Sequence, residues 1–285
     1  MRRTGIFYHP SFSRRSYLTV GRRLADFPAA MQHILERPNV RYYESPAVSE
    51  ELLLKVHTPL MLQQVRRDPF CATAWHSAGG VVQAVAEVAL GNLDNAFAFI
   101  GAGGHHAGRG YFWGYCCFND VVLAIVNARE RCGVRRFAIL DTDAHHGDGT
   151  RELVEDDPDV LHVCLCGADA VSPDGTKVDV DVYTLAEEGG DMDREYLARV
   201  EREFVPRAVA FRPDVTIWYF GFDTHLMDYG SLGLSERCYP RIAEVVIKAA
   251  EEASQGRLVV VLGGGSRTDL ATAIIPKILQ QLADA

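Results

Sequence analysis

The chain contains 285 residues with a formal net charge of -9 and a hydrophobic fraction of 48%, values typical of a folded globular protein. The acidic balance argues against nucleic-acid binding, which usually needs a basic face, and would suit a cationic substrate. No apolar run reaches the roughly 20 residues of a membrane span, and the first residues predict a strand instead of a signal peptide. We therefore expect a cytoplasmic protein without membrane association, and the sequence indicates no particular oligomeric state.

The predicted elements alternate between strands and helices along the chain. Short apolar runs predict buried strands at 5–8, 96–100, 137–140, 160–165, 215–220 and 258–262. Helical periodicity predicts helices at 77–90, 121–131, 194–210, 237–253 and 270–282. This alternation predicts a single α/β domain over residues 1–285, with an open, mostly parallel sheet and helices on both faces.

Polar or glycine-rich segments follow four of the predicted strands. They are Gly101–His106, Asp141–His146, Gly221–His225 and Gly263–Ser266. Ligands bind open parallel sheets at the carboxyl ends of the strands, so we expect these four loops to converge on one crevice.

The segment Asp141–Gly149 places three carboxylates and two imidazoles within nine residues, directly after a strand. Such groups are costly to bury unless they are hydrogen-bonded, paired or bound to a metal. Asp143 and His145 point the same way from an extended segment, so both can ligate one ion, with Asp223 as the third ligand. Three protein ligands leave a coordination position open for water and a substrate carbonyl, which is typical of a catalytic site. We expect Zn2+, with Fe2+ as the alternative.

The tandem histidines His105 and His106 follow glycines that let the backbone turn sharply. Two imidazoles beside a metal site suggest a general base and a general acid. Each needs a carboxylate behind it to fix its tautomer, and Asp141 and Asp148 remain after metal ligation. A polar loop that merely contains two histidines is the alternative, which the agreement of the four loops disfavours.

The seven cysteines predict reduced thiols. Their number is odd and their spacing fits neither a disulfide framework nor a zinc ribbon. Cys116 and Cys117 have no evident acid–base partner, so we interpret them as small buried apolar residues and not as nucleophiles. The set is Cys71, Cys116, Cys117, Cys132, Cys164, Cys166 and Cys238.

Three motifs in this order resemble the histone deacetylase superfamily, which includes acetylpolyamine amidohydrolases and acetoin-utilisation proteins. They are Gly104–Ala107, Gly114–Asn119 and Asp141–Gly149, and Gly221–Thr224 fits the same pattern. The resemblance runs from about residue 78 to residue 265. It implies an arginase-like α/β fold with the active site at the carboxyl ends of the strands.

The resemblance also implies roles for the matched residues. The implied Zn2+ ligands are Asp143, His145 and Asp223. The implied proton-transfer pairs are His106 with Asp148, as the main shuttle, and His105 with Asp141. Gly114 and Tyr115 would line a tunnel for an acyl-lysine-like substrate. A K+ ion, often present in the family, would here involve Asp141, Asp143, His145, Cys164 and Leu165.

Two positions depart from the family pattern. Family members usually follow the C-terminal glycine run with a tyrosine whose hydroxyl polarises the scissile carbonyl, and this chain has Ser266 there. Loss of an oxyanion donor costs about 10²–10³ in rate. Ser266, a substrate-binding candidate, is therefore expected to raise deacetylation when changed to Tyr, unless another group already fills the space. The His-Pro-Glu-Arg-like segment of the family is also absent, with residues 18–23 in its place.

We predict a zinc-dependent amidohydrolase that removes the acyl group of an N-acyl amine, such as an acyl-lysine, an acylpolyamine or a related small molecule. His106 would deprotonate the metal-bound water, and the same pair would protonate the leaving amine. A zinc-bearing acyl-amine binding module with weak or no turnover is the alternative, favoured by Ser266 and opposed by the two His–Asp pairs. A third interpretation is a hydrolase of a small metabolite whose activated acyl group needs less help from an oxyanion donor.

Overall fold

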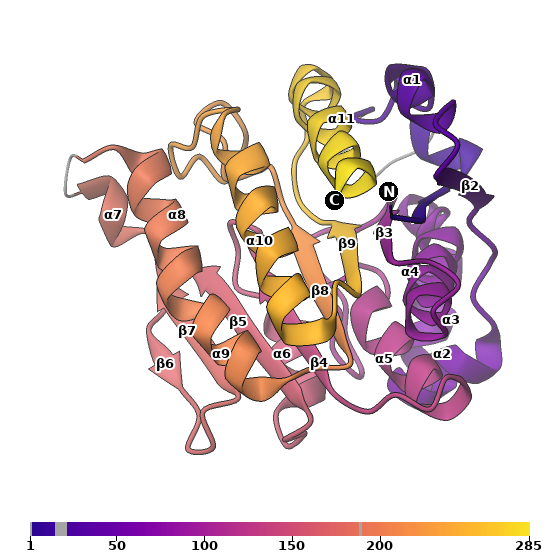
Figure 1. Ribbon diagram of the computed structural model, residues 1–285. Coiled ribbons are helices and arrows are strands. Elements are labelled where there is room, and N and C mark those ends of the chain that lie inside the picture. The colour runs from indigo at the N-terminus through magenta and orange to yellow at the C-terminus, as the bar shows by residue number, and fades with distance from the viewer. Residues whose placement is uncertain (1, 15–21, 188–189) are drawn as a thin grey trace.

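The computed structural model describes residues 2–14, 22–187 and 190–285. Within these ranges a nine-stranded sheet runs through the protein in the order β2-β1-β3-β9-β8-β4-β5-β7-β6 (Figure 1). β6 pairs antiparallel with β7, and the other pairings are parallel. The predicted α/β class and the mostly parallel sheet are confirmed.

Six of the strands correspond to the apolar runs of the sequence. Those six are β1, β3, β4, β5, β8 and β9. The bounds of all nine strands are β1 (Thr4–Tyr8), β2 (Val40–Glu44), β3 (Asn95–Ala98), β4 (Phe137–Asp141), β5 (Val160–Cys166), β6 (Ala170–Val171), β7 (Lys177–Asp181), β8 (Val215–Phe220) and β9 (Leu258–Leu262). The sequence missed β2, β6 and β7. They lie at or next to the edges of the sheet, where partial exposure admits the charged residues that interrupt the apolar runs of β2 and β7, and β6 has only two residues.

Helices cover both faces of the sheet. They are α1 (Gln32–Leu35), α2 (Glu50–Val56), α3 (Pro59–Arg67), α4 (Ala74–Ala89), α5 (Asp120–Arg131), α6 (Asp148–Val154), α7 (Thr184–Glu187), α8 (Met192–Glu203), α9 (Val205–Phe211), α10 (Cys238–Ser254) and α11 (Thr268–Asp284). In Figure 1, α8 to α11 lie in front of the sheet, with α4 and α5 packed together behind it. Among the described helices, none is both long and apolar enough to cross a membrane.

The predicted continuous helix at 194–210 is wrong. The segment divides into α8 and α9 at Phe204, which ends the first helix and precedes the second. Pro206 lies in the first turn of α9. Proline lacks the N–H that would continue a helical hydrogen-bond ladder, but it is tolerated in a first turn, where that N–H has no partner.

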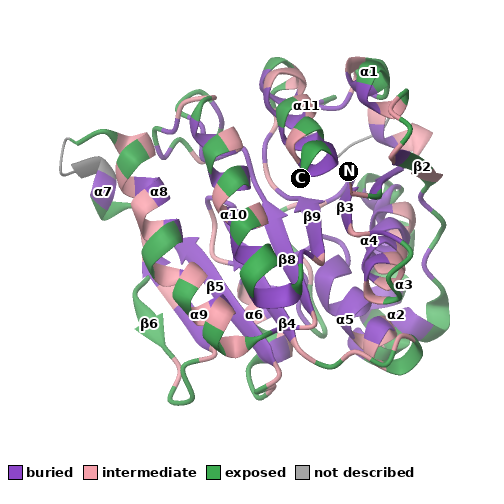
Figure 2. Ribbon diagram, viewed as in Figure 1, coloured by how far each residue is buried: buried purple, intermediate pink, exposed green. Residues whose placement is uncertain are grey.

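The core lies on both faces of the central strands, which are buried along their whole length while the outer helix faces are exposed (Figure 2). The four central strands of the sheet are neighbours in the order β3, β9, β8 and β4. The sequence of each is a continuous apolar run, because helices cover both of its faces. Their carboxyl ends therefore lie side by side at one edge of the sheet.

The expectation that all seven cysteines are reduced is wrong for one pair. Cys71 and Cys117 form a disulfide with their Cα atoms 5.9 Å apart. Cys71 ends a short 3-10 helix after α3, and Cys117 lies in the segment that leads into α5. The two residues are 46 positions apart, so only the folding of the chain between them shows that they are neighbours.

We expect Ile217→Ala on β8 to lower the free energy of unfolding by about 2–5 kcal/mol, because Ile217 is fully buried and truncation leaves a cavity in the central sheet. Urea unfolding followed by tryptophan fluorescence measures the change. Leu60→Ala on α3 is the control, since Leu60 is 64% exposed and its truncation should change stability by no more than about 0.5 kcal/mol. Equal effects of the two substitutions would contradict this picture of the core.

Candidate active site

The four strand-end loops meet at a cavity of about 430 Å³. His105 and His106 come from the loop after β3, and Asp143 and His145 from the loop after β4. Gly264 comes from the loop after β9. The cavity is lined by Arg23, Gly103, His105, His106, Trp113, Gly114, Tyr115, Cys116, Asp143, His145, Tyr219, Tyr229, Gly263 and Gly264. The crevice expected from the sequence is thus present.

Asp143, His145 and Asp223 form a compact set of three ligand atoms within 4.8 Å of one another. His145 Nδ1 lies 3.1 Å from Asp143 Oδ1 and 3.2 Å from Asp223 Oδ2. The two carboxylates are 2% and 0% exposed, so water cannot solvate their charges. Oxygen and imidazole nitrogen are ligands that Zn2+ accepts.

The electrostatics of this set favour a cation. Burial, followed by the nearby charge of Asp143, raises the pKa of Asp223 to about 7. Hydrogen bonds to Asp143 and Asp223 raise the pKa of His145 to about 10. Asp223 Oδ2 is buried, and its ion pair with His145 Nδ1 at 3.2 Å does not have the geometry of a full hydrogen bond. A proton on His145 and a divalent ion are alternative ways to neutralise this pair, so the residues present fit a metal ion.

A backbone N–H and the buried guanidinium of Arg23 stabilise the glycine loop beside Asp143 and Asp223. The N–H of Gly264 donates to Asp143 Oδ2 at 2.7 Å. A Cβ at Gly264 would lie 2.5 Å from an oxygen of Asp143 and of Asp223, so only glycine allows this approach. Arg23, which is 2% exposed, donates to the carbonyl oxygens of Gly263 and Gly265 at 2.6 and 3.0 Å. Arg23 was not predicted as a site residue from the sequence. It ends the segment 18–23, of which positions 18–21 lie outside the described residues.

His105 is held against Asp141. Its Nδ1 lies 2.9 Å from Asp141 Oδ2, and its ring stacks on Tyr219 with the centroids 4.8 Å apart. Burial alone would lower the pKa of His105, but the charges of Asp143 and Asp141 outweigh it and raise the pKa to about 9. A cation on Asp143 would offset one of these charges and bring that pKa down.

His106 pairs with Asp148, and the two pairs of the site therefore differ in electrostatic environment. His106 Nδ1 lies 2.6 Å from Asp148 Oδ1. Burial and then the charge of His105 lower the pKa of His106 to about 4, against the raising effect of Asp148. At neutral pH His106 is therefore uncharged, the form that accepts a proton.

Trp113 completes the His106 side of the site. Its indole Nε1 donates to Asp148 Oδ2 at 2.9 Å, and its ring lies 4.0 Å from the His106 ring between centroids. Trp113 was not predicted from the sequence, although it directly precedes the predicted site residue Gly114. An exposed indole beside a motif glycine is the signal that could have found it.

Gly114 and Tyr115 both line the cavity, as expected for substrate-binding candidates. Gly114 has φ +56°, and a Cβ there would lie 2.5 Å from the His106 ring. Tyr115 also has a left-handed backbone with φ +64°. Two consecutive left-handed residues turn the chain tightly over His106.

Ser266 faces away from the cavity, and a tyrosine from another loop stands there instead. The Ser266 hydroxyl donates to Asp228 Oδ1 at 2.9 Å. Tyr229 lines the cavity, and its ring stacks on His145 with the centroids 5.6 Å apart. The Tyr229 hydroxyl accepts a hydrogen bond from the N–H of Gly265 at 3.1 Å. Tyr229 was not predicted from the sequence, because it lies in none of the motifs that carry the family resemblance.

The residues expected around K+ are divided between two environments. Asp141 Oδ1 accepts a hydrogen bond from the N–H of Asp143 at 3.1 Å, within the loop after β4. Cys164 and Leu165 lie on the adjacent strand β5 and are fully buried. The Cys164 thiol accepts a hydrogen bond from the N–H of Gly147 at 3.5 Å.

Comparison with known proteins identifies relatives of this chain. The family described as Histone deacetylase domain matches residues 67–282. Histone deacetylase 5 of Arabidopsis thaliana is 32% identical over 69% of this chain. The Histone deacetylase-like amidohydrolase of Pseudomonas aeruginosa is 30% identical over 78%, and Polyamine deacetylase HDAC10 of Homo sapiens is 28% identical over 89%. The matched part of the chain spans 32%, 65% and 43% of these three proteins, respectively.

A solved structure shows the same fold. The crystal structure of the HDA15 HD domain aligns with all of this chain and 90% of its own, with a TM-score of 0.85 and 22% identity. At this identity the likeness concerns the fold. The nine-stranded, mostly parallel sheet is therefore part of a fold that this chain shares with the HDA15 HD domain.

We expect the protein to lose stability as the pH falls from 7 to 5, in part because of His57. This side chain is 2% exposed and braces the loop after His106, through Nδ1 to the Gly108 carbonyl at 2.9 Å and Nε2 to the Asn119 N–H at 3.0 Å. Burial lowers the pKa of His57 from 6.5 to about 4. The unfolded chain thus binds a proton first, and the loss attributable to His57 is about 2 kcal/mol.

Urea unfolding at pH 7 and pH 5 measures this loss. In His57→Gln the dependence on pH should be weaker by that amount, whatever the overall stability of the variant. An unchanged dependence on pH in the variant would contradict the assignment.

Proposed function

The chain belongs to the histone deacetylase family, and we propose that it is a zinc-dependent amidohydrolase that removes the acyl group of an N-acyl amine. One observation carries the proposal: one cavity is lined by two members of the three-ligand set, Asp143 and His145, and by the histidines of both His–Asp pairs. A structural metal site would not need two imidazoles of different pKa beside it.

The proposed metal ligands are Asp143, His145 and Asp223. When bound, the ion would act as a Lewis acid that polarises the acyl carbonyl and lowers the pKa of the attacking water. Zinc is the leading choice and ferrous iron the alternative, because oxygen and nitrogen ligands serve both. The K+ site that the family resemblance implies stays a prediction.

His106 and His105 are proposed to move the protons of the reaction. His106, uncharged at neutral pH, accepts the proton of the attacking water at Nε2 while Asp148 holds Nδ1. The same imidazole then returns that proton to the leaving amine. His105, held by Asp141 beside His106, assists the second transfer.

The proposed substrate is an acyl-lysine, an acylpolyamine or a related small amine. Gly114 and Tyr115, together with Trp113, form the cavity wall next to His106 and would contact the chain that leads to the acyl group. The net charge of -9 favours a cationic amine. Relatives named as a polyamine deacetylase and a histone deacetylase-like amidohydrolase support both substrate types, and a cytoplasmic location accords with either.

Tyr229 is proposed to supply the hydroxyl that the family resemblance assigns to the position of Ser266. Its oxygen accepts a hydrogen bond from Gly265 N, so the hydroxyl stands beside the glycine run and retains its proton for a substrate. The ring of Tyr229 contacts the ring of His145, one of the proposed metal ligands, so Tyr229 lies beside the proposed metal site. Ser266 has its hydroxyl committed to Asp228. A donor from a different loop would thus compensate for the substitution.

A binding module with weak or no turnover is the second candidate. The presence of Ser266 at the position where the family usually has a tyrosine favours it. The two intact His–Asp pairs and the position of Tyr229 oppose it, because acyl-amine binding requires no proton transfer.

We expect His106→Ala to lower kcat by about 10²–10⁴ through loss of the general base, while zinc content and affinity for a hydroxamate ligand stay within a few-fold of wild type. The measurement is turnover of the zinc-loaded protein on acyl-lysine peptides, acetylpolyamines and a trifluoroacetyl substrate, with isothermal titration for the ligand. His33→Ala is the matched control outside the site. Absence of turnover by the wild type on all substrates, with unchanged ligand affinity in the variant, would establish the binding module instead.

We expect Tyr229→Phe to lower kcat/KM by about 10²–10³, the usual cost of losing one oxyanion donor. Zinc content should not change, and binding of a trifluoromethyl ketone, which presents an oxyanion, should weaken in parallel. Ser266→Tyr should leave the wild type unchanged but restore part of the activity of Tyr229→Phe. The role proposed for Tyr229 would be contradicted if Ser266→Tyr raised the activity of the wild type and Tyr229→Phe had no effect. The hydroxyl donor would then be missing in the wild type, and its place would be at residue 266.

A further inference from the structure

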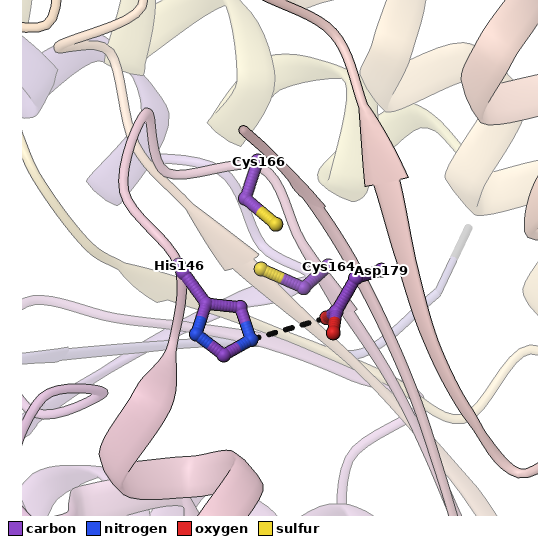
Figure 3. Close-up of side chains that lie close together, drawn as sticks. All are labelled: His146, Cys164, Cys166 and Asp179. Carbon is purple, nitrogen blue, oxygen red and sulfur yellow. Dashed lines mark hydrogen bonds and ion pairs between the residues drawn. The ribbon is translucent and has the colours of Figure 1, made fainter. Parts of the chain in front are cut away.

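A second cluster of metal-ligating side chains lies next to the cavity and takes no part in the proposed reaction. It consists of His146, Cys164, Cys166 and Asp179, whose ligand atoms all lie within 4.8 Å of one another. Figure 3 shows the two sulfurs close together on one side of the His146 ring and of the Asp179 carboxylate. The residues come from the loop after β4, from β5 and from β7.

We propose that this cluster binds a structural Zn2+ ion through two thiolates, one imidazole and one carboxylate. Four ligands of this kind complete the tetrahedral shell that is typical of structural zinc. Tetrahedral zinc places a nitrogen and an oxygen ligand about 3.3 Å apart and two sulfurs about 3.8 Å apart, from its usual bond lengths. His146 Nε2 and Asp179 Oδ1 are 3.1 Å apart, close to that spacing.

Strand geometry explains why the thiols face one ion. Cys164 and Cys166 are alternate residues of β5, so both side chains leave the same face of the strand. Asp179 lies on β7, directly opposite Cys164 in the parallel register. Both thiols are fully buried, whereas the His146 side chain is 36% exposed and gives an ion access from solvent.

The surrounding charges suit a dication. Arg151 donates to the Asp179 carboxylate at 2.6 Å and would orient it as a ligand. Two thiolates and one carboxylate carry three negative charges, which Zn2+ and the Arg151 guanidinium balance. Binding would release the two thiol protons to solvent.

This site shares no ligand with the set Asp143, His145 and Asp223. His146 directly follows His145, and the loop continues into Asp148, the partner of His106. An ion that joins this loop to β5 and β7 would therefore fix the segment that positions both the metal ligand and the proton-transfer pair.

Cobalt titration of the chelator-treated protein, with its Cys71–Cys117 disulfide intact, tests the proposal, because of the two proposed metal sites only this one has cysteine ligands. We expect two equivalents of Co2+ per chain and a thiolate-to-cobalt charge-transfer band in the near ultraviolet. Cys166→Ser should abolish the band and leave one equivalent. Cys132→Ser, which changes a cysteine elsewhere, should keep both. Asp223→Asn should lose the other equivalent and keep the band, so failure of either site is recognised separately.

His146→Gln provides a second test through a partly exposed residue, in case Cys166→Ser does not fold. Its band should require about tenfold or more Co2+ to saturate, since a ligand has been lost. A single equivalent without a band in the wild type would overturn the proposal. A band that survives Cys166→Ser and disappears in Cys164→Ser would overturn it too, placing the ion at the neighbouring group Asp141, His162 and Cys164.

Discussion

Two carboxylates buried against each other are the constraint on which the site depends. Asp143 and Asp223 lie at the carboxyl ends of neighbouring strands, almost without exposure. Buried carboxylates persist only with compensating positive charge and hydrogen-bond donors. His145, the N–H of Gly264 and, as we propose, a divalent cation provide that compensation. The same requirement explains a glycine at position 264, where any side chain would collide with both carboxylates.

The proposed mechanism divides the cavity into two sides. On one side, Asp148 accepts hydrogen bonds from the His106 and Trp113 rings, while burial and the charge of His105 lower the pKa of His106. Asp143 and Asp141 raise the pKa of the neighbouring His105. On the other side, Tyr229 projects from the loop after β8 to the glycine run after β9. The exchange at Ser266 therefore moves the candidate hydroxyl donor to a different loop, which keeps the chemistry compatible with hydrolysis.

Part of this structure could be predicted from residue patterns. The four central strands are continuous apolar runs because helices cover both of their faces, and their order along the chain identified the α/β class. β2 and β7 were missed because charged residues are tolerated near a sheet edge. Pro206 indicates the division between α8 and α9, but the predicted helix at 194–210 ignored it. The disulfide between Cys71 and Cys117 could not be predicted, because no local sequence pattern indicates a contact between residues 46 positions apart.

The sequence by itself determined the sheet class, the strand-end position of the site and the grouping of aspartates and histidines in Asp141–Gly149. Those features follow from local periodicity and from the rule that strand ends share one edge. Only the tertiary structure decided which groups from other loops reach the cavity. Arg23 and Tyr229 enter it, and Ser266 turns to Asp228, because packing and hydrogen bonding between loops set side-chain directions that spacing along the chain does not encode.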